Sequence, residues 1–356
     1  MISDVRRHAI RILLFLNILL LCLGSPALQA QTADTAYTSL LPGPKPLPCS
    51  NHCEQLVGIY GLKPSIIVLE RDGKLHYRDT EGIEHPLRQV KGMFEATLTD
   101  SSKIEIRLPM NADFGPISFL GIGGKTYRRI DGEGGAFFHI TPAKRLSELG
   151  ASAAAAKPPV EAGPFRKPDL LELVKLDPAI HLDIRYAQAN NFLSTPIYTQ
   201  ARAFLQRPAA EALLRVAHKL LPLGYGLLIH DAYRPWYVTK MFWDATPPED
   251  HNFVADPRLG SRHNRGCAVD LTLYDLATGV PVEMPGLYDE MSPRSFPNFP
   301  GGTSLQRWHR DLLRRAMESE GFRVNDDEWW HFDYKDWKQY GILNIRFEAL
   351  AAQASQ

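Results

Sequence analysis

The chain has 356 residues, more than one typical domain, and this length predicts two folded units with additional segments. Its 40 Lys and Arg residues balance 40 Asp and Glu residues, and the zero net charge argues against charge-driven binding of nucleic acid. Hydrophobic residues make up 44% of the chain, as in ordinary globular proteins, so each unit can build a core.

The N-terminal 30 residues have the pattern of a secretory signal peptide. Arginines within the first 11 residues precede an apolar run over residues 12–23, and small residues follow. We expect cleavage near Ala27 or Ala30, removal of residues 1–30 and export to the periplasm. The alternatives are secretion, or retention at the membrane by an uncleaved signal, for which the apolar run is short.

Residues 31–53 are rich in Thr, Ser and Pro and are expected to form an extended leader. In an oxidising compartment Cys49 and Cys53 are expected to form a disulfide, which leaves Cys267 as a free, packed side chain. The alternative is a metal site formed by His52 with the two neighbouring cysteines, but no fourth ligand is apparent.

Residues 54–145 contain short alternating segments separated by turns, and these predict a small antiparallel all-β domain, a sandwich or a partly open barrel. The clearest hairpin joins residues 65–70 to residues 74–77 through Asp72 and Gly73. The other expected strands cover residues 94–98, 104–108, 117–120 and 127–130. No catalytic constellation is recognisable here, so a role in binding, packing or spacing stays open.

Residues 146–168 combine an Ala-rich run with Pro and Gly and are expected to be a linker. In residues 169–350 helices and strands alternate irregularly. Helices are expected to begin at Pro208 and to cover residues 303–320. The expected strands cover residues 182–186, 227–229, 268–273, 322–324 and 330–332. Because no repeating crossover pattern is present, we expect an α+β fold with an antiparallel sheet.

Two stretches of this second unit contain residue types that bind metals. One carries His263 and Asp270, and the other carries His331 with Glu328 three residues earlier. Two histidines and one aspartate can hold zinc and leave a position open for water. A loop that turns at Gly266 would bring the first two residues to one ion. A single histidine is more often structural, so spacing alone leaves both interpretations open.

Two further residues suit such a site. Glu328 would be the general base, since zinc lowers the pKa of bound water to about 7. Arg234 follows a buried strand, and its guanidinium would either pair with Asp231 or another local acid, or donate to the oxyanion that forms when water attacks a carbonyl.

Three motifs occur in the same order as in a known enzyme group. They are Asp-Ala-Tyr-Arg-Pro at residues 231–235, Ser-x-His-x-x-Gly-x-Ala-x-Asp-Leu-Thr at residues 261–272, and Glu-x-Trp-His-Phe at residues 328–332. Together they resemble the VanX-type zinc D-alanyl-D-alanine dipeptidases, which belong to a broader hedgehog-like group that includes D-Ala-D-Ala carboxypeptidases. The resemblance covers about half of the chain. The β domain and the export signal lie outside the usual compact dipeptidase.

The resemblance implies roles for individual residues. His263, Asp270 and His331 would bind one zinc ion per chain. Glu328 would deprotonate the attacking water and pass the proton to the leaving amine, and Arg234 would stabilise the tetrahedral intermediate. The resemblance also implies two substrate-binding residues: Ser261 would help hold the substrate, and Asp289 would pair with its free amino group. The alternative for this last carboxylate is a solvated loop acid.

We therefore expect a zinc hydrolase that splits D-alanyl-D-alanine into two D-alanines outside the cytoplasm, with no nucleic-acid partner and no membrane contact beyond the export signal. The nearest alternative is a D,D-carboxypeptidase or other peptidoglycan peptidase that acts on longer stem peptides. Export favours this alternative, whereas Asp289, Trp329 and Trp330 favour a dipeptidase. The non-enzymatic alternative is a zinc module that binds cell-wall fragments or a protein, but binding alone needs neither Glu328 nor Arg234.

Overall fold

The computed structural model describes residues 37–62, 65–90, 93–97, 103–107, 117–122, 124–131, 139–142 and 144–353. The predicted signal peptide and the start of the predicted leader lie outside the described residues. Leu40–Gln356 form one compact unit, which includes both the expected β domain and the expected α+β domain. In the described part of the chain, no helix has the length and apolar character needed to cross a membrane.

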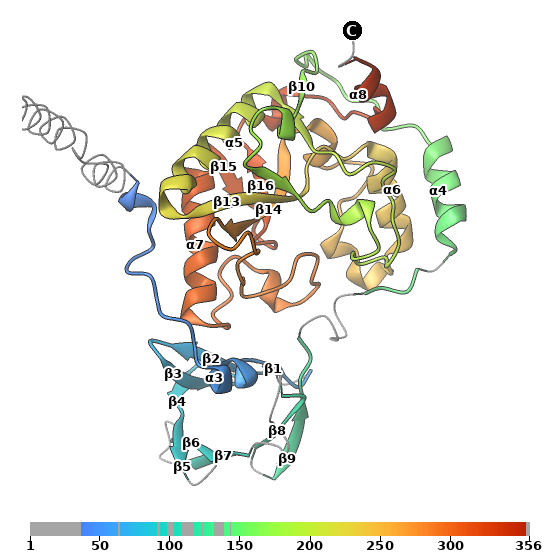
Figure 1. The fold of residues 1–356 in the computed structure, drawn as a ribbon. Helices are drawn as coiled ribbons and strands as arrows, with labels where there is room; N and C mark the ends of the chain where they lie inside the picture. Colours follow the sequence, from blue (N-terminus) through green and yellow to red (C-terminus); the bar gives the residue numbers. More distant parts are fainter. Residues whose placement is uncertain are drawn as a thin grey trace, which may run out of the picture. The chain divides into compact units, whose positions relative to one another are not determined.

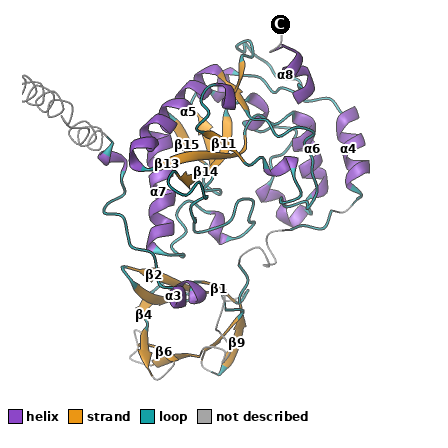
Figure 2. Cartoon of the chain, viewed as in Figure 1, coloured by secondary structure: helices purple, strands orange, loops and turns teal. Residues whose placement is uncertain are grey.

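The N-terminal β region, residues 51–131, contains two antiparallel sheets (Figure 2). One has the strand order β1-β2-β3-β4 and the other the order β5-β6-β7-β8-β9. The strands are β1 (Gly58–Tyr60), β2 (Ile66–Arg71), β3 (Lys74–Arg78), β4 (Glu84–Pro86), β5 (Arg88–Val90), β6 (Met93–Thr97), β7 (Lys103–Arg107), β8 (Phe119–Ile122) and β9 (Lys125–Arg128). Asp72 and Gly73 both have positive φ in the β2–β3 turn, as the predicted hairpin requires. Both sheets contribute to one buried cluster that includes Val68, Phe94 and Leu120.

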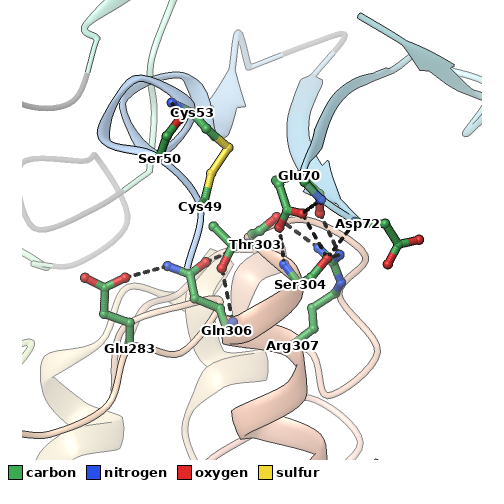
Figure 3. The surroundings of a disulfide bond; sticks show 12 residues. Cys49, Ser50, Cys53, Glu70, Asp72, Glu283, Thr303, Ser304, Gln306 and Arg307 are labelled. Atoms are coloured by element: carbon green, nitrogen blue, oxygen red, sulfur yellow. Dashed lines mark hydrogen bonds between the residues drawn. A yellow bond between two sulfur atoms is a disulfide. The ribbon is translucent and has the colours of Figure 1, made fainter. Parts of the chain in front are cut away.

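A short helix, α3 (Asn51–Leu56), precedes β1, so the expectation of an all-β region is wrong at its N-terminal end. Burial of Leu56 in the cluster shared by the two sheets stabilises this helix. Cys49 and Cys53 form a disulfide at its first turn, as Figure 3 shows. The predicted pairing is therefore confirmed in preference to the alternative metal site.

The segment expected to be a linker, residues 146–168, contains helix α4 (Leu146–Ala155). Its Leu149 and Ala153 are buried, and the helix packs against α6 (Trp236–Ala245). Alanine has the highest intrinsic helix propensity, so an Ala-rich run forms a helix when a neighbouring apolar surface covers one face. The linker prediction gave too much weight to the Pro and Gly residues that follow.

The C-terminal part is built on a five-stranded sheet with the order β11-β13-β14-β16-β15. These strands are β11 (Ile180–Leu182), β13 (Tyr225–Asp231), β14 (Ala268–Asp275), β15 (Phe322–Val324) and β16 (His331–Tyr334). All pairs are antiparallel except β11 with β13, which is parallel. The sheet is therefore mixed. The chain between β11 and β13 includes helix α5, and this crossover lets β13 run in the same direction as β11. A separate antiparallel pair joins β10 (Leu170–Glu172) to β12 (Phe204–Gln206).

Helices α5 (Arg207–Leu220) and α7 (Ser304–Glu318) contact each other and the sheet. Figure 1 shows the first in yellow and the second in orange. Thr303 and Gln306 form a capping box at the start of α7, and this fixes the predicted helix start. Helix α8 (Phe347–Gln353) follows near the C-terminus.

Short 3-10 turns complete the described structure. They cover Thr38–Leu40, Leu173–Lys175, Arg185–Ala187, Leu221–Leu223, Pro248–Phe253, His263–Arg265, Pro293–Ser295 and Trp337–Gln339. The turn at Arg185–Ala187 corrects one prediction, because the strand expected over residues 182–186 ends at Leu182.

Candidate metal and catalytic site

His263, Asp270 and His331 bring three donor atoms together in the interior of the C-terminal part. Asp270 on β14 and His331 on β16 are direct cross-strand partners. The Oδ1 atom of Asp270 lies 3.3 Å from His263 Nε2 and 3.0 Å from His331 Nδ1, and the two nitrogens lie 3.1 Å apart. Tetrahedral zinc with ligand distances of 2.0–2.1 Å places its ligand atoms about 3.3 Å apart, so the triangle has the size that this ion needs. All three residues are buried, and together they could hold a metal ion.

A tight turn brings His263 to this position. The 3-10 turn His263–Arg265 ends at Gly266, whose φ of 67° reverses the chain into β14. A Cβ atom on this glycine would lie 2.5 Å from a Leu170 methyl group, so no other residue fits without a shift. Asn264 holds the turn from inside, since its amide nitrogen donates to the Arg234 carbonyl at 2.8 Å. The predicted loop and strand around the first two ligands are therefore confirmed.

The hydrogen bonds of both histidines direct one free nitrogen of each ring toward the centre. His263 Nδ1 lies 2.6 Å from the Ala232 carbonyl oxygen, and His331 Nε2 lies 3.0 Å from Asp333 Oδ1. Both partners are acceptors, so these ring nitrogens can donate to them while the opposite nitrogens would turn lone pairs toward a cation bound at the centre. Asp270 Oδ1 is buried without a hydrogen-bond partner among the described residues. Two lone pairs and an unpartnered carboxylate oxygen at this separation fit a bound cation.

Two residues that support the ligands were not predicted. Asp333 orients His331, and Tyr288 donates its hydroxyl to Asp270 Oδ2 at 3.0 Å. Asp333 lies two residues after His331 on one strand, so strand alternation could have identified it. No comparable signal existed for Tyr288, because the segment that carries it has no regular period.

Glu328 lies beside the donor triangle without belonging to it. Its Oε2 atom is 3.6 Å from His331 Nδ1 and accepts a hydrogen bond from Asn325 Nδ2 at 3.2 Å. Burial raises the pKa of Glu328 to about 7, against the opposing charge of His331. A carboxyl group with a pKa near neutrality can both accept and return a proton.

Arg234 combines both interpretations that the sequence left open. Its Nε and Nη2 atoms lie 2.9 and 2.8 Å from Asp231 Oδ2, so the local salt bridge is present. Its Nη2 atom also lies 3.8 Å from Asp270 Oδ2. The Cζ atom of the guanidinium lies 5.2 Å from the ring centroid of Tyr186 and 5.0 Å from that of Phe242. The salt bridge therefore fixes a cation next to the donor triangle.

Ser261 and Asp289 lie at the same site. Ser261 Oγ accepts a hydrogen bond from the His263 backbone at 3.2 Å, so this serine also stabilises the turn that carries the first ligand. Asp289 has a positive φ of 60° and accepts a hydrogen bond from the Tyr186 hydroxyl at 3.1 Å. Its Oδ2 atom is buried without a partner among the described residues. Burial raises the pKa of Asp289 well above its ordinary value, with a further contribution from the charge of Asp270.

One cavity of about 270 Å³ joins these groups. Its walls include every predicted site residue: Arg234, Ser261, His263, Asp270, Asp289, Glu328 and His331. Phe192, Phe242 and Trp330 add apolar surface, whereas Trp329 is buried outside the lining. The volume is just below the range of about 300–1,000 Å³ that is usual for ligand sites, so the cavity suits a small polar molecule.

Comparisons with known proteins find relatives of the C-terminal part of the chain. The sequence profile of the D-ala-D-ala dipeptidase family matches residues 166–350, and the match begins after the N-terminal β region. The chain is 35% identical over 188 residues to the D-alanyl-D-alanine dipeptidase of Escherichia coli, which covers 53% of this chain and 96% of that protein. It is 34% identical over 184 residues to the D-alanyl-D-alanine dipeptidase of Enterococcus faecium, covering 45% of this chain and 90% of that protein. The dipeptidase of Streptomyces coelicolor is 32% identical over 175 residues, covering 44% of this chain and 87% of that protein. Since the profile spans more than half of its residues, the chain belongs to the D-ala-D-ala dipeptidase family of peptidases.

Proposed function

We propose that this protein hydrolyses D-alanyl-D-alanine to two D-alanines and uses zinc held by His263, Asp270 and His331. The observation that carries the proposal is the meeting of three metal-donor atoms, a half-buried carboxyl group and a guanidinium in one small cavity. Membership of the dipeptidase family supports the substrate class. A zinc ion at such a site supplies Lewis acidity that acidifies water and polarises a carbonyl.

Glu328 handles the proton in this proposal. Glu328 is not one of the three residues whose donor atoms converge, and its Oε2 atom lies 3.6 Å from His331 Nδ1, close enough to reach a water molecule beside the triangle. It accepts a proton from the attacking water and delivers it to the nitrogen of the leaving D-alanine. Burial raises the pKa of Glu328 above the ordinary value of a carboxyl group, which favours the return of the proton in the second half of this transfer.

Arg234 stabilises charge on the substrate. Asp231 fixes the guanidinium, and the aromatic packing around it excludes water, so the cation needs little reorganisation when the carbonyl oxygen becomes negative. The salt bridge and the proposed catalytic role are therefore compatible.

Asp289 binds the free amino group of the dipeptide. Its buried, unpartnered Oδ2 atom gains an acceptor contact when an ammonium group enters, and that cation favours ionisation of the carboxyl group. A longer stem peptide has an amide in place of the ammonium, so it would leave this carboxyl group unpaired. The site therefore favours a free dipeptide over a stem peptide.

We further propose that the protein acts in the periplasm, where the dipeptide would come from cell-wall peptides. The support is the order of basic, apolar and small residues over residues 1–30. We also propose the hedgehog-like fold for the C-terminal part, on the basis of the three motifs. N-terminal sequencing of protein from the periplasmic fraction tests the export step, and a start near residue 28 or 31 is the expected result.

A direct assay tests the activity. The purified mature chain is incubated with D-alanyl-D-alanine, with L-alanyl-L-alanine, and with a pentapeptide that ends in D-alanyl-D-alanine. Release of D-alanine from the free D,D-dipeptide alone supports the proposal. Faster release from the pentapeptide would instead indicate a carboxypeptidase, and no release from any D,D-peptide would refute the enzymatic proposal.

A further inference from the structure

The loop over residues 285–296 supplies two groups to the site. Tyr288 donates its hydroxyl to the ligand Asp270, and Asp289 carries the carboxyl group proposed to bind the substrate ammonium. Tyr288 is buried and Asp289 has an uncommon positive φ, so both depend on the path of the loop backbone. Whatever fixes this loop therefore influences substrate binding.

Arg294 holds the loop together from within. Its Nε atom donates to the Pro285 carbonyl at 2.7 Å and lies 3.6 Å from Glu290 Oε2. The same Glu290 oxygen accepts a hydrogen bond from the Leu287 backbone at 3.0 Å. Arg294 thus connects the two ends of the turn that contains Tyr288 and Asp289.

The other end of this guanidinium reaches the N-terminal β region. Arg294 Nη1 lies 2.7 Å from Oδ2 of Asp131, which follows β9. Asp131 is itself fixed, because its Oδ1 atom accepts hydrogen bonds from Arg129 Nε at 2.9 Å and from the Ile59 backbone at 3.1 Å. The side chains of Asp131 and Arg294 are only 2% and 13% exposed, so water screens this ion pair weakly.

We propose that Asp131 is a positioning residue for substrate binding, because it orients Arg294 and thereby fixes the loop that presents Tyr288 and Asp289. The N-terminal β region is then part of the binding machinery and not a spacer. The inference about the substrate rests on the proposed function, whereas the inference about the loop does not. Removal of the Asp131 carboxylate leaves the buried charge of Arg294 without this partner. We therefore expect Arg294 to move and the loop that it holds to become less ordered.

A second contact between the same two parts provides a matched control. Glu70 on β2 is also a buried carboxylate, and it accepts hydrogen bonds from the Ser304 backbone and hydroxyl at 2.6 and 3.2 Å (Figure 3). Arg307 donates to the Glu70 carbonyl at 2.7 Å. These partners belong to the first turn of α7 and not to the 285–296 loop. Loss of the Glu70 carboxylate therefore weakens the same junction without releasing Arg294.

The experiment compares Asp131→Asn and Glu70→Gln in the full mature chain. With D-alanyl-D-alanine as substrate, Asp131→Asn is expected to raise KM at least about threefold with kcat little changed. This pattern is expected when a variant weakens the binding of substrate and transition state equally. Glu70→Gln is expected to leave KM unchanged. An unchanged KM in Asp131→Asn, or an equal rise in both variants, would overturn the proposal.

Hydrogen–deuterium exchange separates this inference from the proposed activity. Peptides covering residues 285–296 are expected to exchange faster in Asp131→Asn than in the wild type, and not in Glu70→Gln. If the wild type releases no D-alanine, the proposed function fails while the exchange result still decides the role of Asp131. Equal protection of the loop in all three proteins would overturn that role.

A third variant covers the case in which Asp131→Asn does not fold. Arg294→Lys keeps the charge but removes the fork that joins Asp131 to the Pro285 carbonyl, and it is expected to raise KM and loop exchange in the same way. Wild-type KM and loop exchange in Arg294→Lys would contradict the proposal. Where both single variants fold, the double variant is expected to match either one, and additive effects would show that the residues act independently.

Discussion

The Nε2 atom of His263 and the Nδ1 atom of His331 lie 3.1 Å apart, and both nitrogens also face Asp270 Oδ1. Each ring uses its opposite nitrogen to donate a hydrogen bond, one to a carbonyl and the other to the Asp333 carboxylate. Facing lone pairs repel each other unless a cation lies between them. This relationship, together with the adjacent Asp270 oxygen, is why the three residues could hold a metal ion.

The first prediction concerns the base. Glu328→Gln keeps the size and polarity of the side chain but cannot accept a proton, so kcat is expected to fall by about 10²–10⁴-fold. Metal content and thermal unfolding are expected to stay at wild-type values, since Glu328 is not a ligand. Steady-state kinetics and metal analysis on the same preparation measure both effects. Full residual turnover in this variant would refute the assigned role.

The second prediction concerns the carboxylate behind a ligand. Asp333→Asn weakens the hydrogen bond that orients His331, and zinc affinity is expected to fall by about 10–100-fold. Competition with a chelator such as dipicolinate measures the change. Asp326→Asn is the matched control, because Asp326 is an exposed acid in the same segment. Equal zinc affinity in the two variants would mean that Asp333 does not support the ligand.

The third prediction concerns recognition of the substrate ammonium. Asp289→Asn removes the negative charge, so kcat/KM for D-alanyl-D-alanine is expected to fall by about tenfold or more, as for a lost charge-assisted hydrogen bond. N-acetyl-D-alanyl-D-alanine lacks the ammonium group, and its slow hydrolysis is expected to change little. If the variant loses activity on both substrates by the same factor, Asp289 does not bind the amino group of the substrate.

The fourth prediction concerns the free thiol. Cys267 is fully buried, and burial raises the pKa of its thiol to about 12. The thiol is therefore protonated at neutral pH, and iodoacetamide is expected to leave Cys267 unmodified in the folded protein. After unfolding without a reductant, one cysteine is expected to react in a chain that starts at residue 31 and so lacks Cys22, because Cys49 and Cys53 are paired. Rapid alkylation of the folded protein, detected by mass spectrometry, would contradict the buried placement.

The three candidate ligand residues could be selected from the sequence because each lies in a short motif with a recognisable neighbour pattern. What the motifs could not provide is the register that places Asp270 opposite His331, since strand pairing depends on the whole sheet. Asp333 was accessible from strand alternation and was overlooked. Tyr288 and Asp289 depend on a loop whose path is fixed by contacts such as Arg294 with Asp131, and these residues are far apart in the sequence.

The errors in the fold have related causes. Helix α4 was missed because composition alone was used for a segment whose burial depends on α6. The parallel position of β11 was missed because a three-residue strand gives little periodic signal. In both cases a tertiary contact determined the outcome, and local sequence carried only a weak preference.

Metal content tests the central claim most directly. Wild-type protein and His331→Ala are purified in parallel, their zinc per chain is measured by mass spectrometry of the element, and D-alanine release is assayed on both. We predict one zinc per wild-type chain, nearly none in His331→Ala, and D-alanine release only from the zinc-containing protein. Full D-alanine release from wild-type protein that has been stripped of all divalent metal would contradict the account.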